Sequence, residues 1–311
     1  MVEKKRMNSE NPVFTYVALG LAVIFWGLSF VATKVALQSF TPFCLMFLRF
    51  FGASLFFAIL FRRTGFPPIS RKSVKSLMFL ALMQPGLYFT CETLGLQYTS
   101  ATKTALIIAT IPVFVLALSA ILLKERMRPV NLLGILLSLI GVSLLVFGDQ
   151  GRTALQGSLI GDLLIFGAVL SAAAYMIMAR QLGSTIPSFQ ITGMQIIFGA
   201  ILFFPAFLWD LPKFNWEAVS ADSVIALIGL TLFATIGAFL CYNYALTKIP
   251  AARASVCING IPMVTALGAW VLLGESLTTV QLFGGVVVLV AVFLANHAPR
   301  SQAIAKIVAE V

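Results

Sequence analysis

The stretch IPVFVLALSAILLKE, residues 111–125, is matched 150 residues later by IPMVTALGAWVLLGE, residues 261–275. Both stretches begin with Ile-Pro and end in Leu-Leu-x-Glu, and the same offset aligns further positions without a gap. These further matches are Leu82 with Leu232, Phe89 with Phe239, Cys91 with Cys241, Ala101 with Ala251, Lys103 with Arg253 and Gly134 with Gly284. The shared register indicates that the second half of the chain duplicates the first.

The composition places the chain in a lipid bilayer. Hydrophobic residues make up 60% of the chain and charged residues 10%, and the mean hydropathy is +1.00, whereas charged residues are about a quarter of a typical soluble domain. Apolar runs long enough to cross the hydrocarbon as helices recur along the sequence. They lie at about 15–37, 43–61, 74–96, 101–123, 130–148, 157–180, 188–209, 222–246, 250–273 and 280–297. The sequence therefore predicts an all-α integral membrane protein with ten transmembrane helices.

Lysines and arginines gather on one side of the predicted spans. If the N-terminus is cytoplasmic, the cytoplasmic segments hold Lys4, Lys5, Arg6, Arg62, Arg63, Arg71, Lys72, Lys75, Lys124, Arg126, Arg128, Arg180, Lys248, Arg253, Arg300 and Lys306. The positive-inside rule then predicts that residues 1–14 and 298–311 are cytoplasmic tails. These charges lie in short loops rather than in one patch, so the net charge of +10 does not indicate a nucleic-acid partner.

The ten spans divide into two halves of five, residues 15–148 and 157–297. Because five is odd, the second half enters the membrane from the opposite side, and the sequence predicts two inverted five-helix repeats. Lys103 is then expected near the outer face and its counterpart Arg253 near the inner face, where both are candidate gate residues. A duplication that only built a larger helix bundle is the alternative.

Several short motifs occur in an order that resembles one known family. They are Phe25-Trp26-Gly27-Leu28-Ser29-Phe30 with Lys34, Leu48-Arg49-Phe50, the run from Glu92 to Ala101, and the two Ile-Pro spans. Along almost its whole length the chain resembles the EamA group of ten-helix exporters in the drug/metabolite transporter superfamily. One departure is Ala172, which stands where a tryptophan equivalent to Trp26 is common. The resemblance implies a secondary transporter of the plasma (cytoplasmic) membrane, the inner membrane of a bacterial cell, that moves small metabolites outward.

Two charged residues inside the spans are candidates for the transport route. An ionised side chain at the centre of a span costs about 2.5–3.5 kcal/mol unless it is paired or hydrated. Arg49 and Glu92 are expected at similar depth in neighbouring spans and are predicted to pair. The pair has three open interpretations, which are a gate, a ligand-binding pair and a structural link between helices. If transport is coupled to protons, Glu92 is the candidate carrier.

Other polar and aromatic groups fall near the middle of the predicted spans. With Arg49 and Glu92, the candidate substrate-binding residues are Trp26, Ser29, Tyr88, Tyr175, Gln195, Asn243 and Asn259. Helical spacing places several of them on shared faces, as a polar cavity for a small amphipathic ligand requires. Each of them taken singly fits equally well as a hydrogen-bonding link between helices.

Pro112 and Pro262 occupy equivalent positions in the two halves and are expected in the middle of their spans. A proline there removes a backbone hydrogen bond and bends the helix, so both are candidate hinges. A static kink is equally consistent with the pattern. Pro85-Gly86 has no proline at its counterpart, Thr235-Ile236, so any bend there is expected to break the symmetry.

Templates for enzymes and for ATP binding are absent from the sequence. It has no P-loop, no GxGxxG, no HExxH and no Ser/His/Asp set, and its single histidine is His297. No Cys/His spacing typical of a metal site occurs. We therefore predict no catalytic activity, no cofactor and no metal, and a transport step driven by a solute gradient, by exchange or by protons.

The sequence does not identify the solute. Amino acids or related amphipathic metabolites fit the candidate residues, because a carboxylate would engage Arg49 or Lys103 and an amine would engage Glu92. The alternatives are efflux of drugs or nucleobase-like compounds, and a non-transporting membrane bundle that handles lipids or acts as a sensor. A homodimer also stays open, because no stripe of small residues can be assigned to a lipid-facing surface.

Overall fold

The computed structural model describes residues 12–65, 70–123, 158–249, 251–275 and 278–296, together with short pieces between residues 129 and 144. Every regular element within the described residues is a helix. In chain order these are α1 (Pro12–Ala36), α2 (Pro42–Thr64), α3 (Arg71–Ala81), η1 (Leu82–Leu87), α4 (Tyr88–Leu96), α5 (Ala101–Ile108), α6 (Ile111–Leu123), α8 (Leu159–Leu182), α9 (Ser188–Asp210), η2 (Leu211–Lys213), η3 (Trp216–Ala218), α10 (Ala221–Gly229), η4 (Leu230–Gly237), α11 (Ala238–Lys248), α12 (Ala251–Cys257), η5 (Ile258–Gly260), α13 (Ile261–Leu273) and α14 (Thr279–Asn296).

Six helical stretches are long and apolar enough to cross a membrane. They are Val13–Ala36, Pro42–Thr64, Ala101–Leu118, Leu159–Leu182, Ser188–Lys213 and Ala221–Lys248. Shorter apolar helices cover Ile258–Leu273 and Leu282–Ala291. The predicted all-α membrane class is confirmed by these helices, whereas the number of ten spans stays a prediction.

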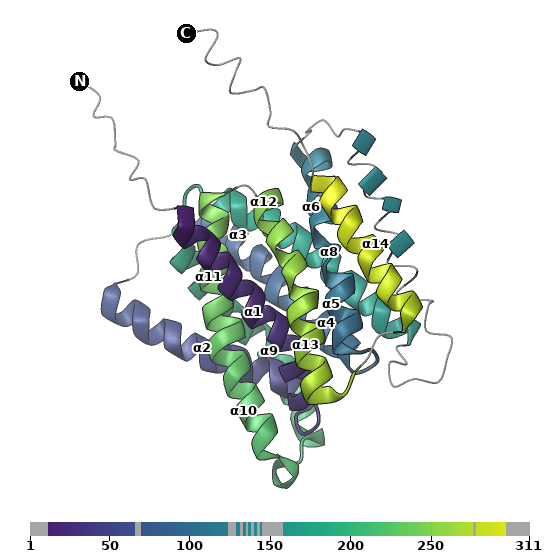
Figure 1. Cartoon of the computed structure of the whole chain (residues 1–311). Helices are drawn as coiled ribbons and strands as arrows, with labels where there is room; N and C mark the ends of the chain where they lie inside the picture. The colour runs from purple at the N-terminus through teal and green to yellow at the C-terminus, as the bar shows by residue number, and fades with distance from the viewer. Residues whose placement is uncertain are drawn as a thin grey trace, which may run out of the picture.

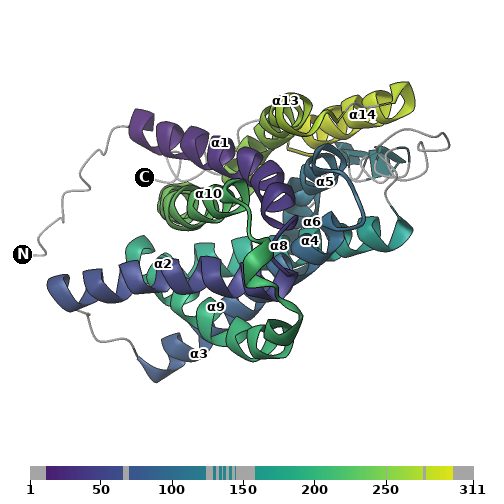
Figure 2. The ribbon, with the colours of Figure 1, turned by 90° about the horizontal axis from the view of Figure 1, so that it is seen from below.

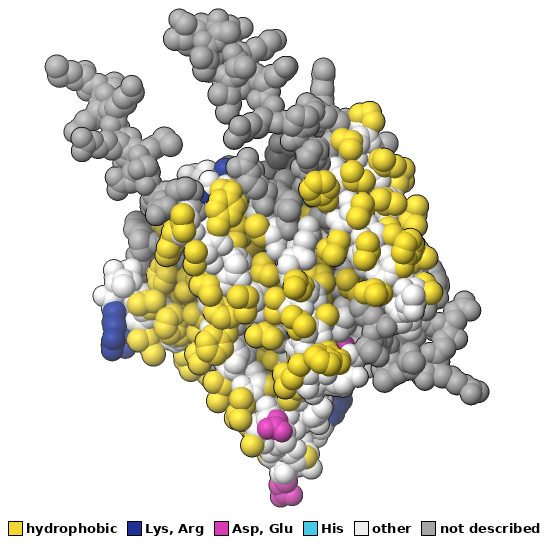
Figure 3. Space-filling model, in the orientation of Figure 1, with side chains coloured by type: hydrophobic (Ala, Val, Ile, Leu, Met, Phe, Trp, Pro, Cys, Tyr) yellow, Lys and Arg dark blue, Asp and Glu magenta, His cyan; other side chains and the backbone are white. Residues whose placement is uncertain are grey.

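The outer surface of the bundle is apolar. Met263 is 71% exposed and Ile225 is 67% exposed, and many other large hydrophobic side chains of α1, α2, α8, α9 and α13 are also open to the surroundings. Figure 3 shows hydrophobic side chains over most of one face, with charged side chains near its edges. Soluble proteins rarely expose an apolar patch of this extent to water. Such a surface is expected where the surrounding solvent is lipid.

Helices from the two ends of the chain pack against each other. The first helix, α1, lies beside α10, α11 and α13, while α2 packs on α9 and α4 packs on α8 (Figures 1 and 2). The last helix, α14, lies against α6 (Figure 1). The main core of the described residues is therefore built from helices near both ends of the chain.

Two helices are interrupted at equivalent points. α5 ends at Ile108 and α6 begins at Ile111, while the single 3₁₀ turn η5 separates α12 from α13. Pro112 and Pro262 therefore lie in the first turn of the second helix of each pair, not within a continuous helix. In a first turn the missing N–H of proline has no intrahelical partner to lose. The expectation that these prolines delete a helical hydrogen bond is corrected accordingly.

Wide π-helical turns also occur at equivalent points, in η1 and η4. In η1 the backbone leaves the helical region at Gln84, and side chains supply the missing partners of the freed carbonyl groups. Gln195 Nε2 donates to the carbonyl of Gln84, and Ser171 Oγ donates to the carbonyl of Met83. Both π-helical stretches occupy equivalent places, but only η1 contains proline and a residue with non-helical backbone, so the bend breaks the symmetry as the sequence predicts.

Candidate functional site

A central pocket lies between the two interruptions. Ile108 and Ile111 flank the break between α5 and α6, while their counterparts Ile258 and Ile261 begin η5 and α13; all four line the pocket. The remaining lining residues are Trp26, Ser29, Phe30, Gln84, Tyr88, Phe89, Glu92, Ala172 and Met176. Its free volume is about 20 Å³, which is room for about one water molecule. This state is closed around the pocket, so a solute must widen it to enter.

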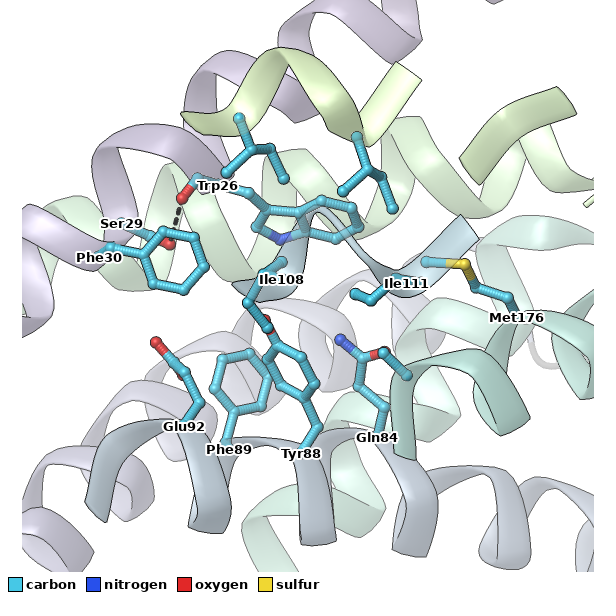
Figure 4. Close-up of a pocket in the computed structure, with 13 residues that line it drawn as sticks. Trp26, Ser29, Phe30, Gln84, Tyr88, Phe89, Glu92, Ile108, Ile111 and Met176 are labelled. Carbon is cyan, nitrogen blue, oxygen red and sulfur yellow. Dashed lines mark hydrogen bonds between the residues drawn. The ribbon is translucent and has the colours of Figure 1, made fainter. Parts of the chain in front are cut away.

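Four of the predicted binding residues line this pocket, namely Trp26, Ser29, Tyr88 and Glu92. The polar atoms of the first two are already engaged, because Trp26 Nε1 donates to the carbonyl of Ala234 at 3.2 Å and Ser29 Oγ donates to the carbonyl of Trp26 at 2.7 Å. Figure 4 shows the indole of Trp26 facing Tyr88 and Gln84 across the pocket. The indole therefore presents mainly its apolar ring to a ligand.

Glu92 is the charged side chain of the pocket wall. It is 1% exposed, and its Oε2 finds no hydrogen-bond partner among the described residues. In Figure 4 its carboxyl group lies beside Phe30 and Phe89 at the edge of the pocket. Leaving a buried carboxylate without a donor is costly, so the pocket is short of a positive or hydrogen-bond-donating group.

Arg49 is buried nearby without pairing with Glu92. No ion pair links the two residues, although the structure describes both. Arg49 Nε donates instead to Thr235 Oγ1, and its guanidinium carbon lies 4.5 Å from the centre of the Phe89 ring. A cation over an aromatic face is stabilised by the ring quadrupole. Arg49 and Glu92 thus make no direct ion-pair contact in this state, although their charges are near enough to interact electrostatically, and Arg49 does not line the pocket.

Tyr175, Gln195 and Asn243 form a separate buried network. Tyr175 OH donates to Asn243 Oδ1, and Asn243 Nδ2 donates to Thr192 Oγ1 at 2.8 Å and to Gln195 Oε1 at 3.2 Å. The network joins α8, α9 and α11 and reaches the pocket only through the bond from Gln195 to the carbonyl of Gln84. These three residues act here as links between helices, which is the alternative that the sequence left open.

The lining residues that the sequence did not indicate are Phe30, Gln84, Phe89, Met176 and the isoleucines at the two interruptions. A signal for the isoleucines existed, since Ile108 and Ile111 recur at the repeat offset as Ile258 and Ile261. Phe89 carried the same signal, since it recurs as Phe239, and Phe30 ends the motif that begins at Phe25; neither pattern by itself distinguishes a pocket wall from general helix packing.

Comparison with known proteins identifies the family. The model of the EamA-like transporter family matches residues 13–147 and 159–297. The chain belongs to this family. Among its relatives, the uncharacterized transporter YetK of Bacillus subtilis is 28% identical over 294 residues, which are 94% of this chain and 87% of YetK. An uncharacterized transporter of Archaeoglobus fulgidus is 29% identical over 282 residues, 90% of this chain and 97% of the relative.

A solved crystal structure has the same fold. It aligns with 90% of this chain and 96% of its own at a TM-score of 0.64 and 15% identity. Together with the apolar helices, the family match makes the EamA-family chain a multi-pass membrane transporter that handles small solutes.

In the EamA-family chain, Lys103 does not face an open mouth. Its side chain is 0% exposed, and Nζ lies 2.9 Å from Oδ2 of Asp162, whose side chain is 2% exposed. Thr99 Oγ1 donates to the other carboxylate oxygen of Asp162. Lys103 was expected near the outer face as a gate residue. In this state its side chain is instead buried in an ion pair between α5 and α8.

The remaining predicted gate and binding residues lie close to the two interruptions of the EamA-family chain. Arg253 is in α12, and its side chain lies outside the described residues. Asn259 is half-buried in η5 beside the pocket, and its Oδ1 has no hydrogen-bond partner among the described residues. Its neighbour Ile258 lines the pocket, whereas Asn259 does not.

A second carboxylate ties α13 to α5 in the EamA-family chain. After Gly274 turns the backbone with a left-handed conformation (φ +65°), Glu275 reaches the first turn of α5. Its carboxylate accepts hydrogen bonds from the backbone N–H groups of Ala101 and Thr102, both at 3.0 Å, and Lys34 Nζ lies 3.7 Å away. A carboxylate at a helix N-terminus accepts hydrogen bonds from N–H groups that have no partner within the helix, and its negative charge interacts favourably with the helix dipole. The contact fixes the end of α13 against the first turn of α5.

Proposed function

We propose that the chain is a secondary transporter that exports small amphipathic metabolites by alternating access, without ATP. The solute would bind in the central pocket, and two inverted five-helix halves with ten transmembrane helices in all would rock about it. The halves would be residues 15–148 and 157–297, and transport would be driven by a solute gradient, by exchange or by protons. Pro112 and Pro262 would mark the points about which the interrupted helices move.

The position of the pocket carries this proposal. Its walls contain both interruptions, at Ile108 and Ile111 in one half and at Ile258 and Ile261 in the other. In transporters built from inverted repeats, substrate sites lie between the repeats and are formed by broken helices. The paired π-helical turns η1 and η4 support the same symmetry.

The proposed topology has both termini in the cytoplasm and the chain in the plasma membrane. It rests on the distribution of lysine and arginine in the sequence. The tails would be residues 1–14 and 298–311. A homodimer is compatible with this topology, since the extensive apolar surface is open to a second copy as well as to lipid.

The geometry widens the range of candidate solutes beyond amino acids. Amino acids were expected because Arg49 or Lys103 would hold their carboxylate, and neither residue lines the pocket. The aromatic rings and the few polar groups of the wall fit a small amphipathic body. Export of amphipathic metabolites is therefore proposed in the broader sense, with amino acids as one subset.

Drug efflux is the second candidate, and one observation favours it. An apolar groove of about 360 Å³ opens between α1 and the α10–η4 region and shares Ser29 with the central pocket. Its wall contains Phe25 and Phe233, whose ring centroids are 5.4 Å apart. An apolar solute dissolved in the bilayer would reach the pocket from this side.

Flux through proteoliposomes tests the proposal. Uptake of labelled amino acids, an aromatic amine and a cationic dye is measured with and without a pH gradient, and Ala172→Trp is compared with the unaltered protein. Ala172 is 1% exposed and lines the pocket, so a tryptophan there should lower the flux at least tenfold. Ser29→Leu is a milder pocket variant for use if Ala172→Trp does not fold.

Leu170→Trp is the matched control on the same helix, since Leu170 is 43% exposed on the outer surface. Its flux should equal that of the unaltered protein. Equal flux through Ala172→Trp and Leu170→Trp would show that solutes do not pass through this pocket.

A further inference from the structure

We propose that the central pocket selects organic cations, and specifically a protonated amine carried on an aromatic or apolar body, over zwitterions and anions. The inference rests on the proposed transport function, because it names the chemical class that the same pocket takes. Four observations support it. They are the single negative charge of the pocket wall, the aromatic rings around that charge, a second hydrogen-bond acceptor in the wall, and the contacts of the nearby lysine and arginine side chains.

The wall of the pocket has a single charged side chain. Of its thirteen lining residues, all of which the structure describes, Glu92 carries the only charge, and none is lysine, arginine or histidine. Glu92 Oε2 is buried without a donor. A ligand ammonium group supplies both the missing charge and the missing hydrogen bond, and charge-assisted bonds of this kind are about twice as strong as neutral ones.

The rings around Glu92 also favour a cation. Tyr88 and Phe89 precede it on α4, and Trp26 and Phe30 face it from α1 (Figure 4). The faces of aromatic rings carry partial negative charge and attract cations, most strongly when water is excluded. An ammonium group held by Glu92 would therefore lie among rings, with its apolar body against Ile108, Ile111 and Met176.

A second acceptor lies in the same wall. The side-chain oxygen of Gln84 is buried and has no hydrogen-bond partner among the described residues. In Figure 4 it lies beyond Phe89 and Tyr88 from Glu92, so a second donor on the body of the ligand, not the ammonium group held by Glu92, would reach it. A carboxylate would instead add one more acceptor to a wall that is already short of donors.

The nearby cations contact other groups of the protein, although Arg49 Nη2 has no hydrogen-bond partner among the described residues. Arg49 lies on Phe89 and Thr235, Lys103 pairs with Asp162, and Lys34 lies beside Glu275. None of the three lines the pocket. The carboxylate of a zwitterionic amino acid would therefore find no positive partner in the wall and would meet the charge of Glu92.

Three probes that share one ring separate the charge classes. Phenethylamine is a cation at neutral pH, phenylalanine is a zwitterion and 3-phenylpropanoate is an anion. Their binding to the full-length protein in lipid nanodiscs is measured by calorimetry. Phenethylamine should bind at least tenfold more tightly than the other two. Phenylalanine binding within twofold of phenethylamine, or no binding of any probe, would overturn the proposal, and this comparison needs no variant.

Substitutions then test the role of Glu92. Glu92→Gln should weaken phenethylamine binding at least tenfold and remove the preference over phenylalanine, whereas Glu92→Asp, which keeps the charge, should retain the preference. Glu217→Gln is the matched control, because Glu217 is an exposed carboxylate in η3, away from the pocket. Unchanged phenethylamine binding by Glu92→Gln would overturn the proposal.

Flux measurements separate this inference from the transport function. Protein-dependent flux of phenylalanine at the rate of phenethylamine, blocked by Ala172→Trp, would overturn cation selectivity and leave transport standing. Selective binding of phenethylamine without flux of any tested solute would support the cation site and count against transport.

Discussion

Lys103 Nζ lies 2.9 Å from Asp162 Oδ2, and the two side chains are 0% and 2% exposed. The pair joins the first turn of α5 to the first turn of α8, so it links the two halves of the chain inside the bundle. Removing one member of a buried ion pair leaves the other as an unpaired charge in a medium of low polarity.

Lys103→Met should therefore destabilise the protein by about 3–5 kcal/mol. Asp162→Asn should have a similar effect, and the double variant should recover much of the loss because no charge is left unpaired. Thermal unfolding in detergent, read as a double-mutant cycle, measures this coupling. Single variants as stable as the unaltered protein would show that the pair contributes nothing.

Asn243 should matter for stability more than for ligand choice. Asn243→Leu removes the bonds to Tyr175, Thr192 and Gln195. Thr192 Oγ1 keeps its bond to the carbonyl of Ser188 and Gln195 Nε2 its bond to the carbonyl of Gln84, so the loss falls mainly on Tyr175 OH and Gln195 Oε1. The expected cost is about 1–3 kcal/mol for each unsatisfied group. Because Asn243 does not line the pocket, the ratio of phenethylamine to phenylalanine affinity should stay within twofold, which calorimetry checks. A lost preference at unchanged stability would place Asn243 in the binding site instead.

Glu275 should keep one end of the bundle closed. Glu275→Ala removes the acceptor of the Ala101 and Thr102 N–H groups and the partner of Lys34. A thiol introduced at Ser100, which is 3% exposed, should then react faster with a water-soluble reagent, after the four native cysteines are replaced.

The expected gain in that labelling rate is at least tenfold, and labelling kinetics measured by mass spectrometry give it. Glu217→Ala serves as the control, since Glu217 is exposed and lies in η3. Equal labelling rates in the two variants would mean that Glu275 only caps a helix.

Pro112→Ala should change stability by less than about 1 kcal/mol, because a proline in the first turn of a helix costs no hydrogen bond. Flux should nevertheless fall, since alanine permits α5 and α6 to join through Ala109 and Thr110. Thermal unfolding and proteoliposome flux measure the two effects, and Pro262→Ala should behave alike in the other half. A gain of about 3 kcal/mol would instead be typical of relieving a proline inside a continuous helix.

Several features were readable from the sequence because they are properties of the chain alone. Apolar composition selects the bilayer, and an offset of 150 residues reveals a duplication without any knowledge of contacts. The same register places Pro112 opposite Pro262 and Ile108 opposite Ile258, which is why the two interruptions occur at equivalent points. Trp26, Ser29, Tyr88 and Glu92 were found because polar and large aromatic groups are conspicuous inside apolar spans.

The tertiary structure decided which of these groups meet. Each residue of a helix points in a different direction, so the orientation of a helix decides which partners its side chains meet. Arg49 contacts Thr235 and Phe89. Lys103 is enclosed with Asp162. Packing between α8, α9 and α11 likewise assigns Tyr175, Gln195 and Asn243 to one another rather than to the pocket. The sequence by itself determined the bilayer as solvent, and it predicts a twofold plan for the chain. The partners of each buried charge were decided by packing alone, because pairing depends on the rotation and depth of helices that are far apart along the chain.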